Sequence, residues 1–260
     1  MRRAAGLALL ALALVLVPAH AGASTTRPSL GLSAMPARVA LLGSGEAAVR
    51  VANPERAAVV VDVGRAGFAL DLRGRPRVVP RRGPRAATSW LSVRPARFVL
   101  PAGASRSLTV SSRVPRRAEP GDHDALVLLT TRPLRGAAGV AVRMRVGVVV
   151  VVRAPGAVVR RLAVQTLRVR RARRARVLEI GIANRGNVTE TLGRGSLRIV
   201  VRRRGRQTSL RAEPRVLRPR TRGIVQVRYA GRLKGWVTAR VRIGPEPSRP
   251  AVTRTFRLEL

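Results

Sequence analysis

The clearest hydrophobic pattern of the chain lies at residues 139–156, with the sequence GVAVRMRVGVVVVVRAPG. Apolar side chains first alternate with other residues, at Val140, Val142, Met144 and Val146. Five consecutive valines follow at positions 148–152, and Pro155 and Gly156 end the run. Strict alternation predicts a β-strand with one solvent-facing side, and an unbroken valine run predicts a strand buried on both faces. We interpret this stretch as the last strand of one β-sandwich and the hinge to a second.

Short segments with a period of two residues recur along the rest of the chain, separated by turn signals every eight to twelve residues. The first segment is interrupted at Pro36, and residues 77–87, rich in Pro, Gly and Arg, are expected to form a mobile loop. Many short strands with regular turns and no helical period predict an all-β fold. We therefore expect two tandem Ig-like β-sandwich domains, at residues 24–155 and 156–260, after an N-terminal signal peptide at residues 1–23.

The N-terminal residues have the three parts of a signal peptide. Arg2 and Arg3 precede an apolar run at residues 4–17, and Ala19-His20-Ala21 offers a cleavage site of small residues. The run is shorter than the roughly 20 residues that a transmembrane helix needs. The sequence thus predicts export, with an extracellular or envelope-associated mature protein and no transmembrane helix in it.

The composition limits how the domains can be stabilised. There is no Cys and only 2% of residues are aromatic, while 46% are hydrophobic. Disulfides and thiolate metal sites are therefore excluded, and the cores must be built from Val, Leu and Ala.

The formal net charge of +40 arises almost entirely from arginine, with Lys234 as the one lysine. Such a charge predicts adhesion to polyanions that fades as salt is added. An alternative is a coding bias towards GC-rich codons that leaves a solvated basic surface. The densest positive segments, and hence the candidate polyanion-binding residues, are Arg170, Arg171, Arg173, Arg174, Arg202, Arg203 and Arg204.

Candidate catalytic and metal-binding residues are few. After the signal, His123 is the one remaining histidine, within the sequence Glu119-Pro-Gly-Asp122-His123-Asp124. This segment is expected to be a surface turn that opens a strand; a cation site is the alternative. No nucleophile motif, phosphate-binding loop or zinc spacing is present. The sequence therefore predicts a protein that is not an enzyme and has no metal or cofactor.

The two tryptophans, Trp90 and Trp236, are expected to be core side chains of their domains. Readers of single-stranded nucleic acid place aromatic side chains among basic ones. The few aromatic residues of this chain do not cluster in the arginine runs, so no specific nucleic-acid binding is expected.

A set of turn and core phrases gives the chain a family resemblance. They are Val51-Ala-Asn53-Pro54, Trp90-Leu-Ser-Val-x-Pro95, Phe98-x-Leu100-Pro-Ala-Gly103, Ile182-Ala-Asn184-x-Gly186-Asn187-Val188 and Leu233-x-Gly235-Trp236. Together they resemble the WxL-interacting surface proteins of Gram-positive bacteria and their actinobacterial relatives and, more distantly, the N-terminal domain of periplasmic pilus chaperones. The resemblance implies an exported Ig-like protein that binds another surface protein or an anionic cell-wall polymer.

Residues 139–153 allow a second interpretation. If this strand lies at a sheet edge, its backbone can pair with a strand of a partner. Pilus chaperones capture subunits in this way, so a pilus-type assembly chaperone is the alternative function. The competing structural interpretation is that residues 139–153 form a buried central strand. The candidate partner-binding residues are Val142, Met144, Val146 and Val148.

Overall fold

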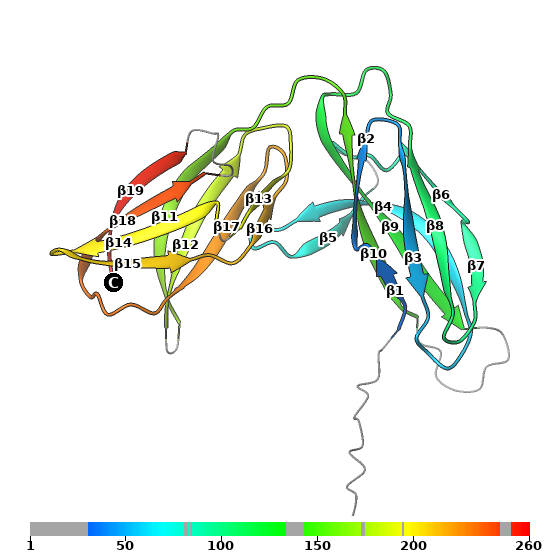
Figure 1. Cartoon of the computed structure of the whole chain (residues 1–260), viewed down its shortest axis with the longest axis horizontal. Coiled ribbons are helices and arrows are strands. Elements are labelled where there is room, and N and C mark those ends of the chain that lie inside the picture. Colours follow the sequence, from blue (N-terminus) through cyan, green and yellow to red (C-terminus); the bar gives the residue numbers. More distant parts are fainter. Residues whose placement is uncertain are drawn as a thin grey trace, which may run out of the picture. The chain divides into compact units, whose positions relative to one another are not determined.

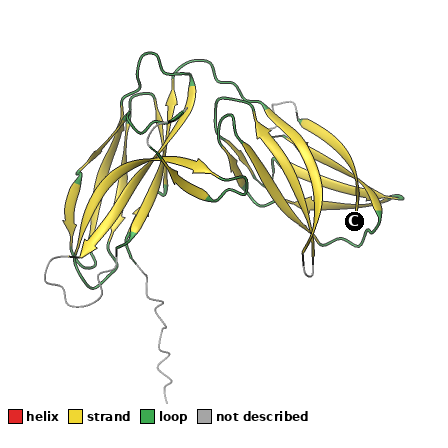
Figure 2. Cartoon of the chain, turned by 180° about the vertical axis from the view of Figure 1, so that it is seen from behind, coloured by secondary structure: helices red, strands yellow, loops and turns green. Residues whose placement is uncertain are grey.

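The computed structural model describes residues 31–80, 83, 85–133, 143–172, 175–193, 195–244 and 251–260 (Figure 1). The predicted signal peptide lies outside these residues and stays a prediction. All regular elements of the described part are β-strands (Figure 2), and none of its residues form a helix that is long and apolar enough to cross a membrane.

The first sandwich consists of two sheets. One has the strand order β1-β3-β8-β6, with bounds Ser33–Met35, Glu46–Ala52, Ser105–Ser112 and Leu91–Arg94. The other has the order β2-β10-β9-β4-β5, with bounds Arg38–Leu42, Arg145–Ala154, Gly121–Pro133, Val59–Leu70 and Pro76–Val79; β7 (Arg97–Leu100) also pairs with β4.

The core between these sheets is made mainly of valine and leucine, as the composition predicts. In β3, for example, Val49 and Val51 point inward and are 1% and 0% exposed, while Glu46 and Arg50 face solvent. Alternation of this kind buries one face of each strand and leaves the other wet. The inward residues of several strands together exclude water, and Phe98 is buried among them.

The second sandwich has its own core and three sheets. Their orders are β11-β12-β17 (Leu162–Ala172, Ala175–Asn184, Arg222–Tyr229), β13-β16 (Glu190–Leu192, Arg215–Leu217) and β15-β14-β18-β19 (Arg206–Arg211, Leu197–Arg203, Trp236–Ile243, Val252–Glu259). Its core gathers apolar residues between Val164 and Leu260, separate from the core of the first sandwich. The predicted all-β fold of two sandwiches is confirmed.

The interruption at Pro36 sends the first strand into two different sheets. β1 pairs antiparallel with β3, and β2 pairs parallel with β10. Proline lacks the N–H that a continuous ladder needs, so the chain can leave one sheet there and join the other. This switch decides how much of β10 is covered.

The valine run is buried on both faces, as predicted. Val148, Val150 and Val152 are fully buried in the core between the sheets. On the opposite face Val151 is 4% exposed, and Val149 packs against a small apolar cluster of Ala66, Phe68 and Leu126.

The expectation of a mobile loop at residues 77–87 is wrong for most of the described residues in it. β5 pairs with Gly67–Leu70 of β4, and the Arg85 side chain is buried. Its guanidinium donates to the carbonyl of Pro120 at 3.3 Å and to the Glu119 carboxylate at 2.5 Å. This Pro- and Arg-rich segment is held in place by residues that are distant in the sequence. Its local composition therefore did not reveal that it would be ordered.

The core assignment of Trp236 is also wrong. Its side chain is 57% exposed, and the Arg257 guanidinium lies 5.1 Å from the ring centre. Trp90, in contrast, is partly buried against the first core. In the second core Tyr229 is the buried aromatic residue, 5% exposed, and its hydroxyl bonds to the Leu233 backbone.

Candidate functional site

β10 is covered along one side for only part of its length. On one side it pairs with β9 over its whole span, Arg145–Ala154. On the other side β2 pairs only with residues 149–153, because the chain before Pro36 belongs to the other sheet. Residues 145–148 therefore form the open edge of β10, along which no other described strand pairs.

The backbone groups that face this open edge can be identified. Val149 donates its N–H to the Ala37 carbonyl at 3.0 Å, on the side of β2. N–H and C=O groups alternate sides along a strand, so Arg145 and Gly147 present theirs on the same side, beyond the point where β2 pairs. Both residues are exposed. The open edge thus offers two N–H and two C=O groups to an added strand.

The predicted partner-binding residues take different places at this edge. Val148 is fully buried, and Val146 is partly exposed and packs against the first core. The end of the Met144 side chain lies against the backbone of Gly31, where it would overlap an added Cβ. Val142 lies outside the described residues.

A buried polar cluster forms at the start of β9. Asp122, His123 and Asp124 are 1%, 5% and 2% exposed, so the expected surface turn is wrong. Asp122 accepts hydrogen bonds from the Arg153 guanidinium at 2.7 and 3.2 Å and from the Thr189 N–H at 2.7 Å. The carboxylate thereby joins β9, β10 and the second sandwich.

The neighbouring carboxylate makes a second link between the sandwiches. Asp124 accepts a hydrogen bond from the Arg218 guanidinium at 2.6 Å, and the two side chains are 2% and 14% exposed. The guanidinium of Arg218 also lies 5.5 Å from the ring centre of Phe68.

The two carboxylates differ in how well their charges are compensated. Burial raises the pKa of Asp122, but the hydrogen bonds from Arg153 and Thr189 outweigh it and hold the pKa below its usual value. Burial raises the pKa of Asp124 above its usual value, although Arg218 opposes the shift. Three hydrogen bonds stabilise the first carboxylate and one the second.

His123 is held as part of the same cluster. Its Nε2 lies 2.7 Å from the Glu119 carbonyl, and its ring centre lies 4.3 Å from that of Trp90. Burial lowers the pKa of the imidazole, and the charge of Arg85 acts in the same direction. The cluster is organised for structure, because its carboxylates are engaged by guanidinium groups. In the described residues no set of three or more His, Asp or Glu side chains could hold a metal ion.

The first predicted arginine cluster lies at the end of the β11–β12 hairpin. Arg170 bonds to Glu179 at 3.1 Å, and Arg171 lies opposite Arg176. Arg173 and Arg174 lie outside the described residues.

The second cluster lies in the β14–β15 hairpin. Arg202 bonds to Gln207 at 3.1 Å, Arg203 donates to the Lys234 carbonyl, and Arg204 occupies the turn with a φ of 44°. Figure 1 shows the two hairpins ending at different places on the second sandwich, so they do not make one patch.

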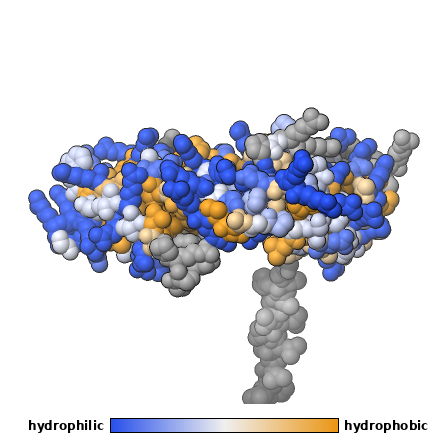
Figure 3. Space-filling model, turned by 90° about the horizontal axis from the view of Figure 1, so that it is seen from above, coloured by the Kyte–Doolittle hydropathy of each residue, from blue (hydrophilic) through white to orange (hydrophobic). Residues whose placement is uncertain are grey.

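Sequence reasoning missed a third basic surface, on the outer face of the sheet β15-β14-β18-β19. Arg198 of β14 lies opposite Arg211 of β15 and Arg242 of β18. The alternation of arginine with buried residues in β14 and β18 was visible in the sequence, but the cross-strand register was not. Figure 3 shows hydrophilic side chains spread across the face in view, with apolar patches between them.

Comparisons with known proteins give similarity at the level of fold. No family model matches the sequence, and no curated protein is significantly similar to it. A chain of the chaperone–tip adhesin complex of CFA/I fimbriae biogenesis is 13% identical, with a TM-score of 0.50, and the match covers 86% of this chain and 98% of that one.

Two other solved structures are similar. The class 5 fimbriae chaperone CfaA is 14% identical, with a TM-score of 0.49, over 86% of this chain and 98% of that one. The YadV chaperone is 9% identical, with a TM-score of 0.48, over 88% and 100%. The chain therefore has a chaperone-like fold of two Ig-like β-sandwich domains.

Proposed function

We propose that the chain is an exported, non-enzymatic protein that binds an extended segment of a partner by strand addition, as a pilus-type assembly chaperone. The observation that carries the proposal is the open edge of β10. This apolar strand is already part of a sheet, and its free backbone groups can pair with one more strand. Main-chain hydrogen bonds give affinity in this mode of recognition, and alternate side chains give specificity.

The other edges of the first sandwich suit this role less well. β1 has three residues and β6 has four, and Pro95 follows β6 directly. Short edges and prolines are the devices by which proteins block unwanted pairing. The open edge of β10, in contrast, continues as a ten-residue strand.

The fold supports the same proposal. A chain of the chaperone–tip adhesin complex reported above has a similar fold, and the match covers 98% of that chain. At 13% identity this likeness describes the fold alone, so the proposed capture of a subunit by this chain rests on the open edge of β10.

A second candidate is binding to a cell-surface protein or an anionic wall polymer, as in the WxL-interacting proteins. The observation that favours it is the concentration of arginine on the outer face of β14 and β18. Binding of this kind would weaken steeply with added salt, whereas strand addition would persist.

Gly147 allows a matched test. Gly147→Pro removes the N–H that faces the open edge and leaves the ladder with β9 intact, since prolines are tolerated where the N–H faces solvent. Gly147→Ala keeps the N–H, and its Cβ would meet only Leu126 and Leu128 atoms at 3.5 and 3.7 Å. Both variants are compared with the wild type in pull-downs from envelope extract at physiological salt.

We expect the wild type and Gly147→Ala to retain one protein partner that Gly147→Pro loses. Hydrogen exchange on the free protein supplies an independent check: the Arg145 and Gly147 amides should exchange quickly, and those of Val146 and Val148 slowly. Equal retention by all three proteins, or loss of all binding when salt is added, would overturn the proposal.

A further inference from the structure

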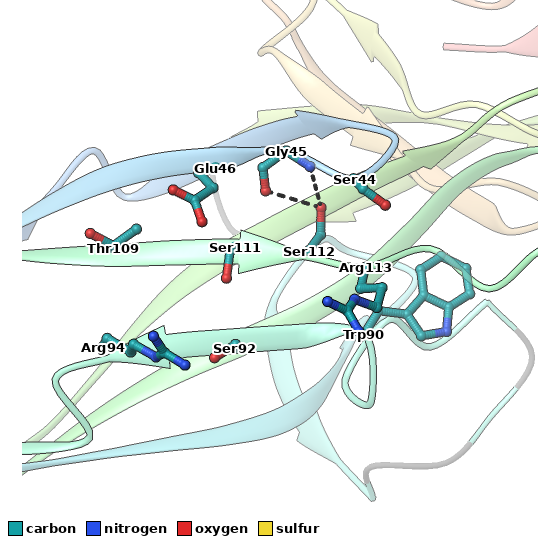
Figure 4. Close-up of a pocket in the computed structure, with 10 residues that line it drawn as sticks. All are labelled: Ser44, Gly45, Glu46, Trp90, Ser92, Arg94, Thr109, Ser111, Ser112 and Arg113. Atoms are coloured by element: carbon teal, nitrogen blue, oxygen red, sulfur yellow. Dashed lines mark hydrogen bonds between the residues drawn. The ribbon is translucent and has the colours of Figure 1, made fainter.

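A polar groove of about 740 Å³ lies on the outer face of the other sheet of the first sandwich, across β3, β8 and β6 (Figure 4). It is away from the open edge of β10, which belongs to the second sheet. Neither the sequence motifs nor the strand-addition proposal gives it a role.

Strand register makes the floor of the groove. Glu46 lies opposite Ser111, and Ser111 lies opposite Ser92, which forms one row across three strands. The next row pairs Thr109 with Arg94. Paired residues on one face have Cβ atoms about 5 Å apart. The small hydroxyl side chains therefore form a continuous floor, and the longer charged side chains of Glu46 and Arg94 stand at its sides.

The hydroxyls of the groove fall into two groups. The Ser112 hydroxyl donates to the Gly43 carbonyl at 2.8 Å and accepts from the Gly45 N–H at 3.3 Å, so it fixes the β2–β3 turn. The hydroxyls of Ser92, Thr109 and Ser111 have no hydrogen-bond partner within the described part of the chain. These three are free to bind a ligand.

The charged groups of the groove are free as well. No ion pair or hydrogen bond engages the side chains of Glu46, Arg94 or Arg113 among the described residues. In Figure 4 the guanidinium of Arg113 lies near Trp90, and that of Arg94 extends along β6 towards Ser92. An unpaired carboxylate is notable in a chain with 52 basic and 12 acidic residues.

This set of groups matches one ligand chemistry. Hydroxyls donate and accept, a carboxylate accepts from neighbouring hydroxyls, and guanidinium groups bind carboxylate or phosphate. A neutral sugar would leave the two guanidinium groups without a partner, and a polyanion without hydroxyl groups would leave Glu46 without a donor. We propose that the groove binds a short stretch of an acidic saccharide, whose ring hydroxyls meet Ser92, Ser111 and Glu46 and whose acidic substituent meets Arg94 and Arg113.

The test uses tetragalacturonate as the acidic probe and maltotetraose as its neutral counterpart, by calorimetry on the full chain at physiological salt. Thr109→Val and Ser111→Ala together remove two free hydroxyls without changing charge or the core. Arg94→Gln removes one charge in the groove, and Arg240→Gln removes one on the outer face of the second sandwich as the control.

We expect the hydroxyl double variant and Arg94→Gln each to weaken tetragalacturonate binding about tenfold, and Arg240→Gln to leave it unchanged. Maltotetraose should bind at least tenfold more weakly than the acidic probe. Unchanged melting temperatures would show that the variants fold. The proposal is overturned if the hydroxyl variant binds as the wild type does, if Arg240→Gln costs as much as Arg94→Gln, or if tetragalacturonate does not bind.

Discussion

Asn53 and Asn184 form the same clamp in the two sandwiches. Each is 1% exposed and stands at the end of a strand, β3 or β12, where the chain turns. Each side-chain oxygen accepts the N–H two residues on, at 3.2 Å for Asn53 and 2.9 Å for Asn184. Each amide nitrogen donates to the carbonyl four residues on, at 2.9 and 2.8 Å, and to a carbonyl of a distant segment.

Replacing either asparagine by alanine should destabilise its sandwich. The change leaves buried carbonyls without donors, and each unsatisfied buried group costs about 1–3 kcal/mol. We expect Asn53→Ala and Asn184→Ala each to lower the free energy of unfolding by about 2 kcal/mol or more, measured by denaturant titration. Ser107→Ala, on the exposed face of β8, is the control and should be neutral. A loss below about 0.5 kcal/mol for both asparagine variants would contradict the clamp.

Asp122 should matter more for stability than Asp124. Asp122→Asn breaks a pair with Arg153 that also receives the Thr189 N–H, and removing one partner of a buried pair costs about 3 kcal/mol or more. The pKa of Asp124 is raised, which means that the ion pair with Arg218 does not fully offset the free-energy cost of burying its charge. Asp124→Asn should therefore cost less than Asp122→Asn in chemical denaturation at neutral pH. The reverse order would show that the Arg218 link is the stronger of the two.

The strands were predictable from the sequence, and their partners were not. Alternation places Val49 and Val51 inward, and Pro36 marks the break in the first strand, because both signals are local. The sheet switch that opens β10 depends on pairing between strands distant in the sequence, which no local pattern reveals.

The burial of the polar cluster was hidden for a similar reason. The Asp122-His123-Asp124 segment has the composition of a surface turn. Its partners Arg153 and Arg218 lie 31 and 94 residues further along the chain. In a chain with 52 basic residues, no spacing could single out those two arginines.

His123 should make the protein sensitive to mild acid. Its pKa is lowered in the fold, so the neutral form is favoured there. The contribution of neutral His123 to the stability of the fold is complete above the pKa of the unfolded state, near 6.5. It is lost as the pH falls through the lower pKa of the folded state. His123→Gln keeps a donor for the Glu119 carbonyl and does not titrate. The charged groups around position 123 are the same in both proteins, namely Glu119, Arg85 and Asp124. Their effects on stability are therefore shared by the wild type and the variant.

The measurement is the free energy of unfolding of the wild type and His123→Gln between pH 8 and pH 5. The advantage of the wild type should shrink as the pH falls below about 6.5. A difference that stays constant with pH would show that the imidazole does not change protonation with folding.

Arg198 should be a position at which removing a charge stabilises the protein. It lies directly opposite Arg211 on one side and Arg242 on the other, and like charges directly opposite each other are unfavourable by about 0.2–1 kcal/mol per pair. Arg198→Thr keeps a side chain that suits a strand and removes both repulsions. We expect a higher melting temperature, with a gain that is largest at low salt and fades as salt screens the charges.

Arg240 supplies the matched control for this effect. It lies on the same face of β18 but opposite Val200 and Thr255, so no like charge faces it directly. Arg240→Thr should change stability little, and the difference between the two variants should shrink with added salt. If Arg198→Thr destabilises the protein, or if its gain does not depend on salt, the row of Arg211, Arg198 and Arg242 is not a source of electrostatic strain.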